Sequence, residues 1–194
     1  MARAPKPLSP KTIEKPQGRR AHPVADHGVF KVERVVYEIT PLPRDIFVFA
    51  VPDWCNVLAE TPEGELVFVW QYRHGTDEMS LEIPGGVIDP GEQPIDAARR
   101  ELEEETGYTA ESFELVSVVE PNPALQGYRC FTFHARGARQ TAKTAFDDLE
   151  DLETLLVNAA DLAALIDDQA VTHALVIVAL ELYLRKYRAL SPAP

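Results

Sequence analysis

The stretch GVIDPGEQPIDAARRELEEETGY, residues 86–108, decides the fold of this chain. It begins as a loop that contains glycine and proline, and it continues with alanine, arginine, leucine and glutamate, which favour helices. Pro94 suits the first turn of a helix, and Gly107 stands where a helix usually ends. The sequence therefore predicts a helix over residues 94–106 that packs against a glycine-proline loop.

Three glutamates of this predicted helix share one face. Glu101, Glu104 and Glu105 stand at positions i, i+3 and i+4, so their carboxylates lie within one turn of each other. Like charges so close repel each other unless a positive group lies between them, and a hard divalent cation is the natural partner of oxygen ligands. Glu103 lies about 200° around the helix from Glu101 and is interpreted as structural or solvated. The cluster favours an enzyme with a metal site.

The bulk composition describes one globular domain. The chain has 194 residues, of which 45% are hydrophobic and 26% are charged, and this length can bury a core. A formal net charge of −12 argues against a surface that binds nucleic acid. We find no apolar segment long enough to span a bilayer and no secretory signal, so we expect no membrane partner. We expect a cytoplasmic protein in which Cys55 and Cys130 are buried thiols.

Residues 1–24 are interpreted as a basic, proline-rich N-terminal tail. Residues 1–20 contain six basic side chains and one acidic one, and four prolines among the first sixteen residues exclude a helix. The tail is either a flexible segment, or it lies on the acidic body of a second subunit or near an anionic substrate. The catalytic domain is expected over residues 25–190.

The apolar pattern predicts an α/β (α+β) fold with a mixed sheet sandwiched between helices. Strands are expected where Val, Ile, Phe and Tyr are frequent, at residues 29–39, 45–51, 54–60, 65–72, 81–83, 112–120, 128–135 and 152–157. Thr61-Pro62-Glu63-Gly64 predicts a hairpin turn between the third and fourth of these strands. Two further helices are expected at 159–167 and 173–187, with Asn158 and Thr172 as their N-caps.

Residues 86–108 also match a known motif. They follow the pattern G-x5-E-x7-R-E-U-x-E-E-x-G-U, in which U is a bulky apolar residue. The matching positions are Gly86, Glu92, Arg100, Glu101, Leu102, Glu104, Glu105 and Gly107, with Tyr108 where an aliphatic residue is usual. This pattern resembles the Nudix box, the signature of the Nudix (MutT-like) hydrolases. The resemblance implies the Nudix fold, with its α-β-α layers, and the hydrolysis of a diphosphate linkage.

The residue types suit this chemistry. A diphosphate is anionic and resists attack by hydroxide, and Mg²⁺ can neutralise its charge while it lowers the pKa of a bound water. Glu101, Glu104 and Glu105 would supply metal ligands, for Mg²⁺ or alternatively Mn²⁺. Arg100 is interpreted as an orienting partner of a glutamate such as Glu92, through a forked hydrogen bond.

The resemblance extends beyond the box. The QYR segment that ends at Arg73 and the LEIPGG segment that contains Glu82 are similar to segments of ADP-ribose pyrophosphatases and related nucleoside-diphosphate-sugar hydrolases. Pro123 stands where that group has a proline. The resemblance implies that Arg73, Glu82 and Pro123 contact the substrate. It also implies that the main-chain carbonyl of Gly85 binds the metal.

The same group uses an acid on a loop after the last core strands, as metal ligand or as base. The resemblance implies Glu150 for this role, with Glu153 as the second candidate and a box glutamate as an alternative base. The expected catalytic residues are therefore Glu105, Glu104, Glu150, Arg100 and Glu92.

Several functional alternatives stay open. Residues 124–127 depart from the segment that follows the proline in ADP-ribose pyrophosphatases, so both ADP-ribose and GDP-mannose-like nucleotide sugars are expected substrates. The alternatives are a Nudix hydrolase of dinucleoside polyphosphates, nucleoside triphosphates or capped RNA, and a non-catalytic module that senses nucleotides. We expect a homodimer, because of the habit of the group, the basic tail and an apolar C-terminal helix. The five histidines show no metal-ligand spacing and are interpreted as local or core residues.

Overall fold

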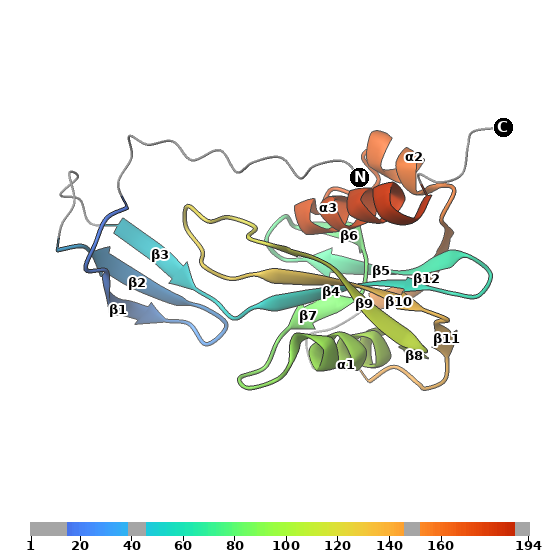
Figure 1. Ribbon diagram of the computed structural model, residues 1–194, viewed down its shortest axis with the longest axis horizontal. Coiled ribbons are helices and arrows are strands. Elements are labelled where there is room, and N and C mark those ends of the chain that lie inside the picture. The colour runs from blue at the N-terminus through green and yellow to red at the C-terminus, as the bar shows by residue number, and fades with distance from the viewer. Residues whose placement is uncertain (1–14, 39–45, 146–151, 189–194) are drawn as a thin grey trace, which may run out of the picture. The chain divides into compact units, whose positions relative to one another are not determined.

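The computed structural model describes residues 15–38, 46–145 and 152–188 of the chain (Figure 1). The chain divides into two compact units, Met1–Ala50 and Val51–Pro194. The glutamate helix belongs to the second of them. No helix among the described residues is long and apolar enough to cross a membrane.

The first unit contains a three-stranded antiparallel sheet. Its order is β1-β2-β3, with bounds Arg20–Asp26, Lys31–Val36 and Ile46–Ala50. Strand β1 was not expected, and it spans the predicted tail boundary at residue 24. Pro23 fits there because β1 is an edge strand whose register shifts between Pro23 and Ala25, and such positions tolerate a residue without an N–H group.

The second unit is built on a mixed sheet of seven strands (Figure 1). Its main path runs β12-β5-β4-β10-β9, with bounds Leu152–Asn158, Glu65–Arg73, Trp54–Glu60, Cys130–Arg136 and Ser112–Val119. Strands β10 and β4 are parallel, and the other neighbours are antiparallel. Short strands complete the unit: β6 (Glu78–Glu82) on β5, β7 (Gly85–Val87) on β4, and the pair β8 (Tyr108–Thr109) and β11 (Arg139–Gln140).

Helices cover both faces of this sheet (Figure 1). Helix α1 (Pro94–Thr106) packs on one face, and α2 (Leu162–Asp167) and α3 (Ala174–Tyr183) pack on the other, where the π-helix η1 (Leu184–Arg188) continues α3. Helix α1 has its predicted bounds. The predicted layers of a mixed sheet between helices are therefore confirmed.

The N-termini of the last two helices differ from the prediction. Asn158 does not cap a helix, since its side chain accepts a hydrogen bond from the Ala160 N–H in a turn, and α2 begins only after Asp161. Helix α3 begins one residue later than expected, with His173 rather than Thr172 at the N-cap. Asn side chains bond to nearby backbone in turns as well as at helix ends, so the residue type alone misplaced the start at Asn158.

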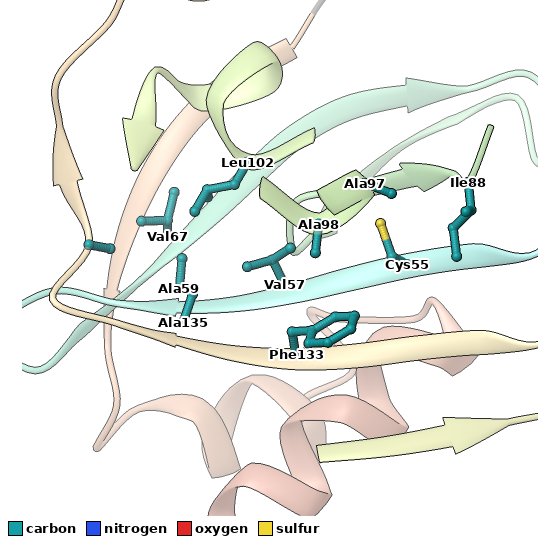
Figure 2. Close-up of a cluster of buried hydrophobic side chains, with 11 residues drawn as sticks. Cys55, Val57, Ala59, Val67, Ile88, Ala97, Ala98, Leu102, Phe133 and Ala135 are labelled. Carbon is teal, nitrogen blue, oxygen red and sulfur yellow. The ribbon is translucent and has the colours of Figure 1, made fainter. Parts of the chain in front are cut away.

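Alternate side chains of β4 enter two different cores. Cys55, Val57 and Ala59 pack with Leu102 and other residues of α1 on one face, as Figure 2 shows. Leu58 points to the opposite face and packs with α2 and α3. Because both faces are covered, β4 is apolar along almost its whole length.

Both cysteines are buried free thiols, as predicted. Burial raises the pKa of Cys55 and of Cys130 to about 12. Both side chains are therefore neutral at physiological pH, and they serve as small apolar core residues.

The predicted hairpin between β4 and β5 pairs only beside its turn. The two strands meet at Glu60 and Leu66, and the turn closes through a hydrogen bond from the Gly64 N–H to the Thr61 carbonyl. Beyond that point β7 pairs with β4 and β6 pairs with β5. This arrangement brings residues 85–87 beside β4, and the chain then continues from β7 into α1.

Candidate active site at the glutamate helix

Two adjacent glycines let the box loop lie close to its neighbours. A Cβ atom on Gly85 would stand 2.2 Å from the carbonyl oxygen of Cys55, and one on Gly86 would stand 2.4 Å from the carboxyl carbon of Glu101. At residue 85 the backbone of β4 leaves no room for a side chain, and at residue 86 a side chain would displace the Glu101 carboxylate. The absence of a Cβ atom therefore places the backbone of β7 directly against β4 and against the Glu101 carboxylate.

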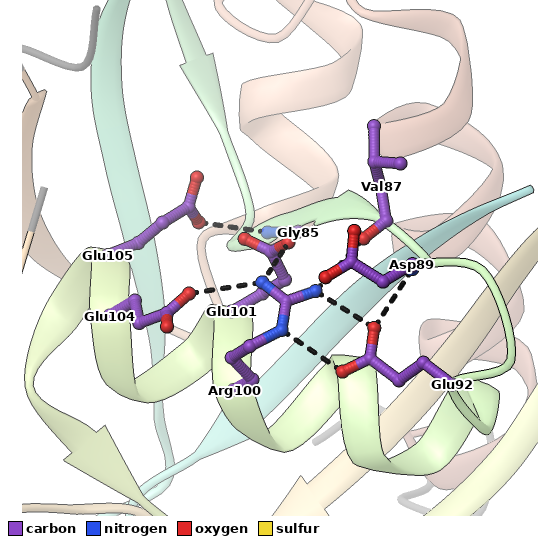
Figure 3. A network of polar contacts seen from close by, with 8 residues as sticks. All are labelled: Gly85, Val87, Asp89, Glu92, Arg100, Glu101, Glu104 and Glu105. Atoms are coloured by element: carbon purple, nitrogen blue, oxygen red, sulfur yellow. Dashed lines mark hydrogen bonds and ion pairs between the residues drawn. The ribbon is translucent and has the colours of Figure 1, made fainter. Parts of the chain in front are cut away.

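Arg100 lies at the centre of the polar network in Figure 3. Its Nε and Nη2 atoms each donate to one oxygen of Glu92 at 3.0 Å, so the expected forked contact is present. Its Nη1 atom donates to Glu101 at 2.8 Å and to Glu104 at 3.0 Å. The sequence predicted a divalent metal ion between these glutamates. In this conformation the guanidinium of Arg100 supplies the positive charge between Glu101 and Glu104.

The same network fixes the loop before the helix. Arg100 Nη2 also donates to the carbonyl of Val87 at 3.0 Å, and Glu92 accepts a hydrogen bond from the Asp89 N–H at 3.0 Å. The hydrogen bonds from Arg100 lower the pKa of Glu92 below its ordinary value, and the contact with Glu92 raises the pKa of Arg100. Both groups are therefore charged at neutral pH and hold the loop to α1.

Glu105 lies deeper than its neighbours. Its carboxylate accepts a hydrogen bond from the Gly85 N–H at 2.9 Å. Only 4% of Glu105 and 8% of Glu101 are exposed. Both face a cavity of about 780 Å³, which is lined by Gly85, Gly86, Val87, Arg100, Glu101, Glu104 and Glu105 and by Trp54 and residues 71–75.

The donors of this cavity fit a divalent cation by their chemistry. Three carboxylates from one helix face line it, with the backbone of Gly85 beside them, and hard cations prefer such oxygen ligands. Within residues 15–38, 46–145 and 152–188, however, no three acidic, histidine or cysteine side chains converge on a single metal position. The contacts of Arg100 and of the Gly85 N–H hold the carboxylates in this arrangement.

Arg73 and Glu82 form a second ion pair at the edge of the cavity. Arg73 Nε and Nη2 each donate to one oxygen of Glu82 at 2.7 Å. Glu82 is only 3% exposed. Burial raises the pKa of Glu82, but the hydrogen bonds and the charge of Arg73 outweigh burial and hold this pKa below its ordinary value of 4.5. Arg73 lines the cavity that contains the box glutamates.

This pair gives a pH-dependent prediction. Glu82→Gln should lower the free energy of unfolding by about 2 kcal/mol at pH 7, since it removes two charge-assisted hydrogen bonds. Because the folded pKa lies below the unfolded one, the stabilising effect is complete above about pH 4.5 and is lost as the pH falls through the folded pKa. Urea unfolding between pH 7 and pH 3.5 measures the difference between the two proteins. If the difference in free energy of unfolding widened below pH 4.5, the lowered pKa assigned to Glu82 would be wrong.

Among the described residues of the predicted site, Glu82, Glu92, Pro123 and Glu153 do not line this cavity, although Glu82 and Glu92 contact its residues Arg73 and Arg100. Pro123 lies exposed in the loop between β9 and β10. Glu153 lies exposed on β12, opposite Trp70 of β5. Glu150 lies outside the described residues. The roles proposed for Pro123, Glu150 and Glu153 stay predictions.

The sequence did not single out Trp54 as a site residue, although Trp54 lines the cavity. It reaches this place because β7 pairs with β4 and sets Val87 opposite Trp54. A three-residue strand gives no recognisable pattern, so the only available signal was the position of Trp54 at the start of a predicted strand.

The mixed sheet between helices and the carboxylate-bearing helix on a glycine loop are the arrangement that the resemblance to the Nudix box implied. The NUDIX domain profile matches residues 53–177, which lie inside the catalytic domain expected over 25–190. The chain therefore belongs to the Nudix family, and it is a hydrolase that acts on diphosphate bonds.

Individual proteins are similar to this chain over different shares of its length. The ADP-ribose pyrophosphatase of Bacillus subtilis (strain 168) is 33% identical over 141 residues, which cover 72% of this chain and 76% of that protein. The methanol dehydrogenase activator of Bacillus methanolicus is 33% identical over 105 residues, which cover 54% of this chain and 57% of that protein. The crystal structure of an ADP compounds hydrolase superimposes with a TM-score of 0.81 at 23% identity, covering 95% of this chain and 100% of the other. This last likeness confirms the predicted fold.

Proposed function

We propose that the protein cleaves the diphosphate of nucleoside diphosphate sugars to a nucleoside monophosphate and a sugar phosphate. ADP-ribose is the first candidate substrate and GDP-mannose is the second. The observation that carries this proposal is the single cavity that gathers the box carboxylates and Arg73. The similarity to an ADP-ribose pyrophosphatase over 72% of the chain supports ADP-ribose.

We also propose that the reaction depends on Mg²⁺, with Mn²⁺ as an alternative. Glu101, Glu104, Glu105 and the carbonyl of Gly85 would hold the ion. A bound divalent cation supplies positive charge against the diphosphate and makes water more acidic.

The side chains have distinct roles in this proposal. Arg73 attracts the anionic diphosphate into the cavity, and Glu82 holds its guanidinium in place. Arg100 orients Glu101 and Glu104 through its Nη1 atom. Glu105 or Glu150 accepts the proton of the attacking water, since a carboxylate in reach of that water can act as general base.

A comparison of substrates tests the function. We expect kcat/KM for ADP-ribose or GDP-mannose to exceed that for diadenosine polyphosphates and GTP by at least about tenfold. A chelator should abolish turnover, and added Mg²⁺ or Mn²⁺ should restore it. Preferred cleavage of GTP or a dinucleoside polyphosphate would favour the other Nudix activity. Nucleotide binding without any metal-dependent release of AMP would favour a sensing module.

A homodimer and a cytoplasmic location also remain proposals. Apolar side chains stay exposed in the second unit, among them Leu115 and Val118 on β9 and Val178 on α3, and exposed apolar surface often marks subunit contacts. Sedimentation at micromolar concentration should give twice the mass of one chain. A monomer under these conditions would overturn the dimer.

A further inference from the structure

A second cavity, of about 490 Å³, adjoins the cavity of the box glutamates. Trp54, Arg73 and Gly75 line both cavities. The rest of its wall comes from β6, from the loop before β10 and from the start of α3, and it includes Met79, Ser80, Glu82, Tyr128, His173 and Leu175. A molecule held at Arg73 can therefore extend from one cavity into the other.

The wall of this second cavity differs chemically from that of the first. Aromatic and aliphatic side chains alternate with neutral hydroxyl groups, and the charges of Arg73 and Glu82 compensate each other. Among the described residues of this wall, Glu78 is the one further Asp, Glu, Lys or Arg. Apolar walls with a few placed polar groups suit an uncharged ring better than a phosphate.

His173 is the unexplained polar residue of this cavity. Its Nδ1 atom is buried and makes no hydrogen bond to any described residue, although buried polar atoms are normally bonded. The helix does not explain the residue type either. His173 is the N-cap of α3 but its side chain makes no cap hydrogen bond, and Ser, Thr, Asp or Asn are favoured there.

His173 lines the same cavity as Arg73 and Glu82, the two members of the ion pair. A group bonded to His173 would thus lie close to a phosphate held by Arg73.

We propose that the second cavity binds the uncharged, hydroxylated sugar ring at one end of the substrate, and that the imidazole of His173 forms a hydrogen bond with a hydroxyl of this ring. The inference rests on the proposed function and adds a specificity-determining residue to it. Trp54 and Tyr128 supply apolar surface for the ring. ADP-ribose carries a ribose on either side of its diphosphate, so the ring is that of the nucleoside or that of the terminal sugar.

Binding of the separate products tests this assignment. Calorimetry with the full chain, without metal, would compare AMP, ribose 5-phosphate and inorganic diphosphate on the wild type and on His173→Phe. The phenylalanine keeps an aromatic ring but removes the nitrogen. We expect the Kd of one sugar-containing product to rise about tenfold, as for one lost hydrogen bond, while the Kd of diphosphate changes less than about twofold. The product that loses affinity identifies the end bound there.

Two further variants complete the test. His173→Asn keeps a polar atom near the place of Nδ1 and suits the N-cap, so it should bind both products within about threefold of the wild type. Glu181→Gln, a change at a half-buried residue of the same helix that lines neither cavity, should change none of the three Kd values. In steady state, His173→Phe should raise KM for the nucleotide sugar and leave kcat unchanged.

The outcomes separate this inference from the function on which it rests. Equal binding by His173→Phe and His173→Asn, or an equal loss for all three ligands, would overturn the role of His173 while the wild type stayed active. A wild type that hydrolysed no nucleoside diphosphate sugar would overturn the proposed function, and the inference with it.

Discussion

Replacing Glu105 by glutamine should lower kcat for ADP-ribose about 10³-fold, within the range for a lost general base or a weakened metal site. Glu105 is almost fully buried, and its carboxylate accepts a hydrogen bond from the Gly85 N–H. Glutamine keeps the size of the side chain and an oxygen for this bond, but it removes the negative charge. Both proposed roles, cation ligand and base, require that charge. Turnover measured over a range of Mg²⁺ concentrations would show whether metal activation also weakens.

Glu103→Gln is the matched control for this change. Glu103 belongs to the same helix but is exposed and lines neither cavity. The same loss of one charge should therefore leave kcat within about twofold of the wild type. Full turnover by Glu105→Gln would sink the assignment of Glu105. A comparable loss in Glu103→Gln would show that helix charge in general, rather than position, controls the rate.

The second large effect is expected at Gly85. Gly85→Ala should lower the free energy of unfolding by about 3 kcal/mol, and the melting temperature by roughly 10 °C. The new Cβ atom would stand 2.2 Å from the carbonyl oxygen of Cys55 and 3.0 Å from the Cα atom of Asn56. Both are backbone atoms of β4, so they can move only if the pairing of β4 with β7 is disturbed. Thermal denaturation measures the loss.

Gly86→Ala separates stability from activity. Here the new Cβ atom would meet the carboxyl group of Glu101, the end of a side chain that can rotate. We expect a stability loss of only about 1 kcal/mol, but a clear fall in kcat, because the Glu101 carboxylate would leave its place beside Arg100. If Gly85→Ala proved no less stable than Gly86→Ala, the close contact with β4 would not be what restricts residue 85 to glycine.

Features that depend on neighbouring residues were predictable from the sequence. Helix α1 has the predicted bounds because Pro94 sits in its first turn and Gly107 ends it with a positive φ of 72°. The forked contact of Arg100 with Glu92 was also expected, since both residues belong to one short loop and helix. The start of α2 was misplaced, because Asn158 bonds within a turn instead of capping the helix.

Features that depend on strand pairing were not predictable. Strand β7 has only three residues and exists because it pairs with β4, with Val87 opposite Trp54 and Gly85 opposite Asn56. These pairs are 33 and 29 positions apart in the chain (87 − 54 and 85 − 56). The second cavity likewise joins β6, the loop before β10 and the start of α3. His173 was interpreted as an ordinary local or core residue, because nothing near it in the sequence distinguishes it.

The sequence by itself determined a helix with three carboxylates on one face and a glycine loop before it. Helical periodicity is a local property, so Glu101, Glu104 and Glu105 had to lie together once α1 formed. Only the tertiary structure decided what meets them. It set the Gly85 N–H against Glu105 and brought Arg73 to the same cavity, because long-range strand pairing and close packing at glycine determine which backbone segments can approach the helix.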